Sequence, residues 1–291
     1  MPLARVNGVN LYYEMTGEGS VPLIFSHEFA GDYRSWEAQV RFFSRRCRVI
    51  TYNSRGYPPS DVPTNPEAYS QAIVVDDLYY LLQHLKFSKA HIIGLSMGGN
   101  IALNFGIKYP EVCASLVIAG CGAGSSHHEQ FVKDARTVVD RLEKEGMDKV
   151  AEFYSMGPTR VQFRRKDPRG WQEFFAQLKA HSTIGSALTF RGIQMKRPTI
   201  FALEADLKKI KVPTLIMIGD EDEPCIEPAI FMKRHIQSSG LVVFPQTGHT
   251  MNLEEPDLFN RVVLDFLTLV EAGKWAIRDP VSVPGAELLP K

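Results

Sequence analysis

The serine at position 96 stands at the centre of the segment Gly94-Leu95-Ser96-Met97-Gly98. Apolar residues typical of a buried strand precede this segment, and residues with helical spacing follow it. A sharp turn from strand to helix crowds its flanking positions, where glycine fits best. The hydroxyl would then stand at a helix N-terminus, where backbone N–H groups favour negative charge. The pattern predicts a nucleophilic serine, although these five residues alone also fit an ordinary glycine-rich loop.

A serine hydroxyl becomes a good nucleophile when a base removes its proton, and that base is usually a histidine. Among the 8 histidines, His249 is the strongest candidate, because it follows the last expected strand directly and comes after Gly248. Functional groups of α/β proteins gather where the strands end. His27, in an earlier loop, is expected to brace that loop or to line a substrate pocket.

A third group must orient the imidazole, and the segment Asp220-Glu221-Asp222-Glu223 follows an apolar strand. An acidic segment is also typical of solvated surface, so Asp222 and Asp220 both remain candidates at this point. Charge that develops on a carbonyl oxygen requires backbone N–H donors. We expect these donors from Met97, the residue after the serine, and from Phe29, in the loop after the first central strand.

The elements that must position these residues alternate between strand and helix over the first 119 positions. The Asn7-Gly8 pair predicts a hairpin over residues 4–15. Such alternation is typical of a parallel sheet covered by helices on both faces. The expected strands are 21–26, 48–52, 90–95 and 112–119, and the expected helices are 36–43, 69–85 and 97–109.

Helical periodicity without a confident strand then extends over residues 125–207. We predict an α/β core over 1–123 and 208–291, with residues 124–207 forming a helical cap over the carboxyl edge of the sheet. The tail, 272–291, is expected to be irregular coil. The expected helices of the cap are 131–145, 147–154, 171–181 and 184–194; beyond it we expect strands 213–219 and 241–244 and helices 228–236 and 256–270.

Composition narrows the class of protein. The 291 residues are 44% hydrophobic, and 33 basic residues balance 33 acidic ones, which argues against binding to nucleic acid or to an anionic membrane surface. Neither a signal peptide nor a membrane-spanning stretch is apparent. We expect a cytoplasmic monomer or homodimer without metal or cofactor. The cysteines show no metal-binding spacing and are expected to be buried free thiols; they are Cys47, Cys113, Cys121 and Cys225.

Together these motifs resemble the α/β-hydrolase family, over nearly the whole chain. The resemblance implies a mostly parallel eight-stranded sheet with a helical cap inserted after the sixth strand. In similar enzymes the acid is the third residue after the strand-end glycine, which favours Asp222 over Asp220. Ser96 at the nucleophile position argues against haloalkane dehalogenases and epoxide hydrolases, which use a carboxylate there. The matching segments are His27-Glu28-Phe29, Asn53-Ser54-Arg55-Gly56, 94–98, 219–222 and Gly248-His249.

Two residues depart from the family pattern. Glu28 replaces the glycine usual after the loop histidine, and Asn53 replaces the usual aspartate. A carboxylate at position 28 would oppose an oxyanion unless it points away, pairs with a cation such as Arg55, or is protonated. The alternative is that Glu28 contacts a polar group of the substrate or a catalytic water.

The combined interpretation is a serine hydrolase that cleaves a small carboxylic ester or lactone through an acyl-enzyme. Alternatives are a carbon–carbon bond hydrolase for ring-cleavage products, a perhydrolase, and a ligand receptor on a hydrolase scaffold. The cap is rich in aromatic and basic residues. Trp171 is therefore a candidate pocket residue, and one arginine or lysine of the cap is a candidate receptor for a substrate carboxylate.

Overall fold

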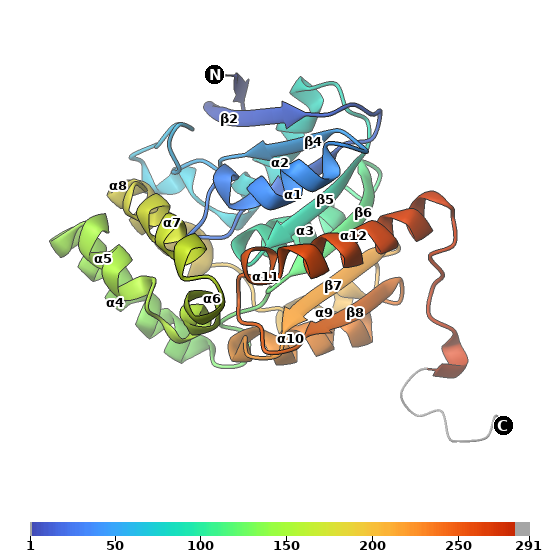
Figure 1. The fold of residues 1–291 in the computed structure, drawn as a ribbon. Helices are drawn as coiled ribbons and strands as arrows, with labels where there is room; N and C mark the ends of the chain where they lie inside the picture. The colour runs from blue at the N-terminus through green and yellow to red at the C-terminus, as the bar shows by residue number, and fades with distance from the viewer. Residues whose placement is uncertain (1, 283–291) are drawn as a thin grey trace.

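A computed structural model describes residues 2–282 and contains one eight-stranded sheet (Figure 1). The strand order is β1-β2-β4-β3-β5-β6-β7-β8; β2 runs antiparallel to β1 and β4, and all other neighbours are parallel. The predicted mostly parallel sheet is confirmed. Its strands are β1 Leu3–Val6, β2 Val9–Thr16, β3 Leu23–Ser26, β4 Val49–Tyr52, β5 Ala90–Leu95, β6 Cys113–Ala119, β7 Thr214–Gly219 and β8 Ser239–Phe244.

The first two strands form the predicted hairpin. Asn7 and Gly8 both have positive φ, 45° and 80°. A two-residue turn of this kind matches the right-handed twist of the strands that it joins.

Side chains alternate between the two faces of the sheet, so each face has its own apolar core. Leu23, Phe25 and Ile93 pack on one face with α1 (Glu37–Phe43), α11 (Met251–Glu254) and α12 (Pro256–Glu271), in front of the sheet in Figure 1. Ile24 and Ile92 pack on the other face with α2 (Gln71–His84), α3 (Met97–Lys108) and α10 (Glu223–His235). Each fully buried Leu, Ile or Phe contributes about 1.5–3 kcal/mol of transfer free energy.

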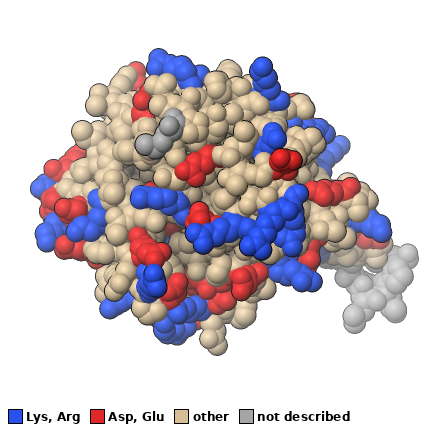
Figure 2. Space-filling view, turned by 45° about the horizontal axis from the view of Figure 1, so that its top comes forward, with Lys and Arg blue, Asp and Glu red and all other residues tan. Residues whose placement is uncertain are grey.

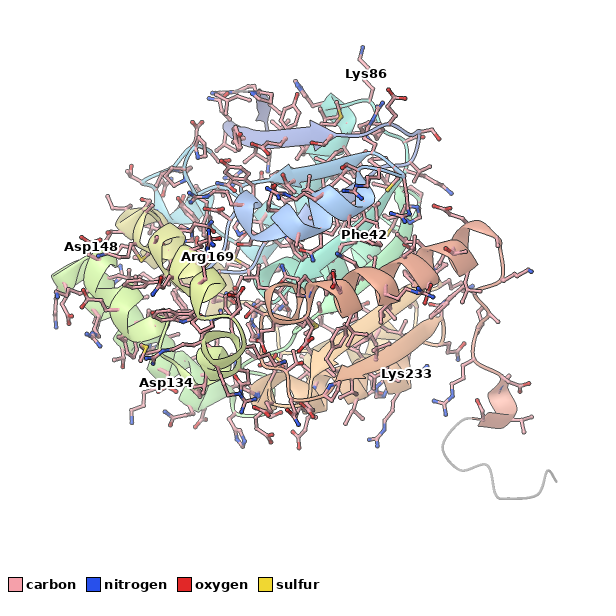
Figure 3. All side chains as sticks on the ribbon, in the orientation of Figure 1. Phe42, Lys86, Asp134, Asp148, Arg169 and Lys233 are labelled. Atoms are coloured by element: carbon pink, nitrogen blue, oxygen red, sulfur yellow. The ribbon has the colours of Figure 1, made fainter. Side chains whose placement is uncertain are left out.

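Helices fill the chain between β6 and β7, and those within residues 128–189 lie at the left of the view in Figure 1. Asp134, Asp148 and Arg169, labelled in Figure 3, mark three of these helices. The assignment of residues 124–207 as a separate cap remains a prediction, and the word cap is used below for these residues. Its helices are α4 His128–Glu145, α5 Met147–Tyr154, α6 Val161–Lys166, α7 Pro168–Lys179, α8 Thr183–Thr189 with a π-helical turn Phe190–Gln194, and α9 Glu204–Leu207.

Several elements differ from the expectation. Helix α10 begins at Glu223 and not at Pro228, because Pro224 takes the first turn while Pro228 lies inside the helix. A 3₁₀ turn, Pro158–Arg160, and α6 were not predicted at all. Both are too short to show a helical period.

The cysteines, the surface charges and the C-terminal tail can be compared with what the sequence predicted. All four cysteines are free, and all but the partly buried Cys47 are buried. Basic and acidic groups are interspersed over the face in Figure 2. Within residues 2–282, no helix has the length and apolarity to span a bilayer. Residues 273–279 are irregular, a 3₁₀ turn covers Pro280–Ser282, and 283–291 lie outside the described residues.

Candidate active site

Ser96 stands between β5 and α3 with a positive φ of 56°, a strained conformation for a non-glycine residue. The turn is tight on both sides. A side chain at Gly94 would overlap the Gly98 carbonyl, and one at Gly98 would overlap the Ser26 carbonyl in β3. The Ser96 N–H donates to the Ala119 carbonyl, 2.8 Å away at the end of β6. The glycine spacing therefore reflects backbone packing between β3, β5 and α3.

His249 and Asp222 form a buried pair. The His249 Nδ1 lies 2.7 Å from the Asp222 Oδ2. Because a carboxylate accepts, Nδ1 carries the proton and Nε2 keeps its lone pair. Asp220 instead accepts a hydrogen bond from the Thr247 N–H at 3.1 Å. The structure thus brings Asp222, and not Asp220, to the imidazole.

The turn after β6 links this pair to the serine. Ser96 is tied to Ala119, and the next residue, Gly120, packs against both partners. A Cβ atom there would lie 3.3 Å from the His249 carbonyl and 3.4 Å from Asp222 Oδ2. The ends of β5, β7 and β8 thus converge around the end of β6.

The structure shows no hydrogen bond from Ser96 Oγ within the described residues. A contact between nucleophile and base is often long in a substrate-free enzyme and tightens when substrate is bound. His249 Nε2 also lacks a hydrogen-bond partner in residues 2–282, so its lone pair is available to a nearby hydroxyl.

Two backbone N–H groups near the serine are free to bind a ligand oxygen. Neither the Phe29 N–H nor the Met97 N–H donates a hydrogen bond among the residues described. The Phe29 carbonyl, by contrast, accepts from the Tyr57 hydroxyl at 3.0 Å, which holds the loop in place. Met97 is the first residue of α3, whose dipole favours negative charge. These features suit an oxyanion hole.

Both ring nitrogens of His27 are engaged inside its loop. Nδ1 lies 2.7 Å from the Glu28 carbonyl and must donate to it, while Nε2 accepts from the Ser54 N–H at 3.1 Å. Burial lowers the pKa of His27 to about 4. His27 is therefore a neutral brace between two loops, and its nitrogens are not available to a substrate.

Asn53, the second departure from the family pattern, uses both ends of its amide. Its oxygen accepts from the Tyr33 N–H at 2.8 Å, and its nitrogen donates to the Pro58 carbonyl at 2.8 Å. An ionised aspartate could accept the first bond and not donate the second. The asparagine is thus explained by its loop.

Glu28 forms an ion pair with Arg160, and both side chains are nearly inaccessible, 2% and 1% exposed. Of the expected alternatives, pairing with a cation is confirmed, but the cation named as the example, Arg55, is wrong. Arg55 binds Asp77 instead, with nitrogen–oxygen distances of 2.6 and 2.7 Å. Arg160 belongs to the 3₁₀ turn that was not predicted, so its partnership with Glu28 had no local signal.

The loop that carries His249 is held from two sides. Glu254, in α11, accepts hydrogen bonds from the Gly248 N–H at 2.8 Å and the Thr250 N–H at 3.2 Å. From the cap, the Thr159 carbonyl accepts from the His249 N–H at 3.4 Å. Neither contact was predicted from the sequence; for Glu254 the available signal was an acid five residues after the histidine.

Trp171 lies inside the cap. Its indole N–H donates to the Ser155 carbonyl at 3.0 Å, its ring stacks on Phe175 at 5.6 Å, and Arg164 lies over it. These contacts do not bring Trp171 to the serine. Its proposed place in the pocket remains a prediction.

Asp222, His249 and the buried Cys225 place one potential metal ligand each within 4.8 Å of one another. The Cys225 thiol donates to the Gly120 carbonyl at 3.4 Å, and burial raises its pKa well above the usual value. A neutral thiol beside a hydrogen-bonded His–Asp pair is a poor metal site, because zinc binds the thiolate.

Known proteins share this architecture. Epoxide hydrolase 3 of Mus musculus is 32% identical over 280 residues, covering 92% of this chain and 76% of its own. 3-Oxoadipate enol-lactonase 1 of Acinetobacter baylyi is 27% identical over 269 residues, covering 91% and 95%. A thermophilic esterase from Thermogutta terrifontis, solved with malate bound, has a TM-score of 0.82 at 28% identity, covering 93% of this chain and 99% of its own.

Residues 21–256 match the family described as alpha/beta hydrolase fold. That match spans the serine turn, the acidic turn and the histidine loop. The chain therefore belongs to the α/β-hydrolase fold family and is a hydrolase enzyme.

Proposed function

We propose that this hydrolase cleaves a carboxylic ester or lactone through an acyl-enzyme formed on Ser96. The observation that carries the proposal is the 2.7 Å contact of His249 Nδ1 with Asp222, which leaves Nε2 basic at the strand ends where the strained serine stands. The lactonase and esterase relatives support this choice of substrate.

In this mechanism Ser96 Oγ attacks the substrate carbonyl while His249 Nε2 takes its proton. Asp222 stabilises the imidazolium that results. The Phe29 and Met97 N–H groups bind the oxyanion. The tetrahedral intermediate collapses, His249 protonates the leaving alkoxide, and the acyl group stays on Ser96. Water, activated by the same histidine, then releases the acid and restores the serine.

The epoxide hydrolase relative does not change this proposal. In the resemblance described above, epoxide hydrolases use a carboxylate as nucleophile, and this chain has a serine at that position. An esterase or lactonase mechanism is therefore favoured over epoxide opening.

The test combines covalent labelling with turnover. A fluorophosphonate probe should add once to the wild-type protein and not to Ser96→Ala, as read by intact mass. Ser96→Ala should also lower kcat on p-nitrophenyl esters and lactones by roughly a millionfold, by the precedent of another serine hydrolase. Ser126→Ala, which removes a serine bonded to Glu227, is the control and should label normally. A loss of only a few-fold in Ser96→Ala would reject the mechanism.

A further inference from the structure

We infer that Arg160 is a positioning residue for the oxyanion hole: it neutralises Glu28 and holds that carboxylate away from the forming oxyanion. The inference rests on the proposed function, because it concerns the charge that develops when Ser96 attacks. Glu28 is one of the two residues by which this chain departs from the family pattern.

The charge of Glu28 lies beside the proposed oxyanion hole. Glu28 directly precedes Phe29, whose N–H is a proposed oxyanion donor, and its carboxylate is buried. A buried charge acts strongly on its neighbours because water screens it little. An uncompensated carboxylate here would oppose the negative oxygen that the hole must stabilise.

Other titratable groups near Glu28 do not offset its charge. Burial lowers the pKa of His27 to about 4, so the ring is neutral at pH 7. Burial also raises the pKa of Tyr57 and of Tyr154, so both phenols stay protonated. Among the described residues, Arg160 is the cation in contact with Glu28.

Aromatic rings of the cap and the carboxylate of Glu28 hold Arg160 in place. Its guanidinium lies 5.3 Å from the Phe174 ring centre and 5.9 Å from that of Tyr154, both in the cap. Its Nε and Nη1 are buried without a hydrogen-bond partner in residues 2–282, as is the Oε1 of Glu28. Aromatic rings thus fix the cation, and its Nη2 contact with Glu28 fixes the carboxylate.

The same short segment of the cap also supports the base. The carbonyl of Thr159, the residue before Arg160, accepts from the His249 N–H. Adjacent residues of one turn therefore contact the oxyanion loop and the histidine loop. This placement suits a residue that sets the geometry of both.

The experiment compares Arg160→Met, Glu28→Gln and the double variant Glu28→Gln/Arg160→Met, with Arg197→Met as matched control. Arg197 is also a buried arginine of the cap, and it binds the Ala123 carbonyl, not Glu28. The readouts are kcat and KM on a p-nitrophenyl ester, and the rate of fluorophosphonate labelling, all at one pH.

In Arg160→Met the unpaired carboxylate should lower kcat and the labelling rate by roughly a hundredfold, comparable with the loss of one oxyanion donor, with KM changed much less. The double variant should recover most of the rate. Arg197→Met should show neither effect.

Equal rates for Arg160→Met and the double variant would overturn the inference, because a merely structural arginine is not rescued by removing a charge at Glu28. A kcat within threefold of wild type in Arg160→Met would overturn it too. If Arg160→Met does not fold, the folded double variant decides: near-wild-type labelling supports the inference, and labelling a hundredfold slower contradicts it. Absence of labelling in the wild type would instead reject the proposed function.

Discussion

At the scale of single residues, the choice between two acids two positions apart depends on side-chain direction. Asp222 is the N-cap residue of α10 and its carboxylate meets His249, whereas Asp220 turns to the Thr247 N–H. In the proposed mechanism Asp222 orients the base, whereas Asp220 holds the loop that carries it.

Asp222→Asn should therefore lower kcat by about 10⁴-fold, as the equivalent change does in another serine hydrolase, because the amide favours the wrong imidazole tautomer. Asp220→Asn retains an oxygen for the Thr247 N–H and should lower kcat less than tenfold. Steady-state kinetics at pH 8 on one ester compares the two. A larger loss in Asp220→Asn would reverse the assignment.

At the scale of elements, the serine turn depends on how closely α3 approaches the sheet. Gly98 lies against the carbonyl of Ser26, the last residue of β3. A side chain at position 98 would therefore push α3 away from that strand. The contact involves backbone on both sides, and no flexible side chain can move to relieve it.

Gly98→Ala should destabilise the fold by about 1–3 kcal/mol or more, the range for overpacked sites. Gly157→Ala is the control, because its added Cβ would meet only the Tyr154 carbonyl, at 3.2 Å, in a turn of the cap. Urea unfolding followed by circular dichroism measures both. A Gly98→Ala variant as stable as Gly157→Ala would show that the turn has room to move.

The elements that the sequence predicted well are those with a local cause. The Asn7-Gly8 turn, the strand before Ser96 and the glycines around it follow from backbone rules that act over a few residues. The Glu28–Arg160 pair spans 132 positions and joins a loop to a 3₁₀ turn, so no periodicity marks it. The start of α10 was misplaced because two prolines, at 224 and 228, both suit a first turn.

At the scale of the whole molecule, buried neutral histidines make the fold sensitive to acid. Burial lowers the pKa of His91 from 6.5 to about 4, and its ring lies 2.8 Å from the Ser115 hydroxyl across β5 and β6. Below pH 6.5 the unfolded chain binds a proton that the folded chain refuses, so stability falls as pH falls from 6.5 toward 4. His27 contributes in the same direction.

His91→Gln should therefore flatten the fall in unfolding free energy between pH 6 and 5, by up to about 1.4 kcal/mol per pH unit. The free energies come from urea titrations at each pH. His84→Gln, at an exposed position of α2, should leave the slope as in the wild type. Identical slopes for all three proteins would show that His91 takes up its proton in the folded state as readily as in the unfolded one.

The pair between Glu28 and Arg160 restricts how the active site can change over generations. Either partner alone leaves a buried charge without its counter-ion, at a cost of about 3–5 kcal/mol, so a lineage is expected to gain or lose the two residues together. A chimera that receives its cap from a relative without that arginine should be destabilised as long as Glu28 remains. These two positions, one in the core and one in the cap, are thus expected to vary together among relatives.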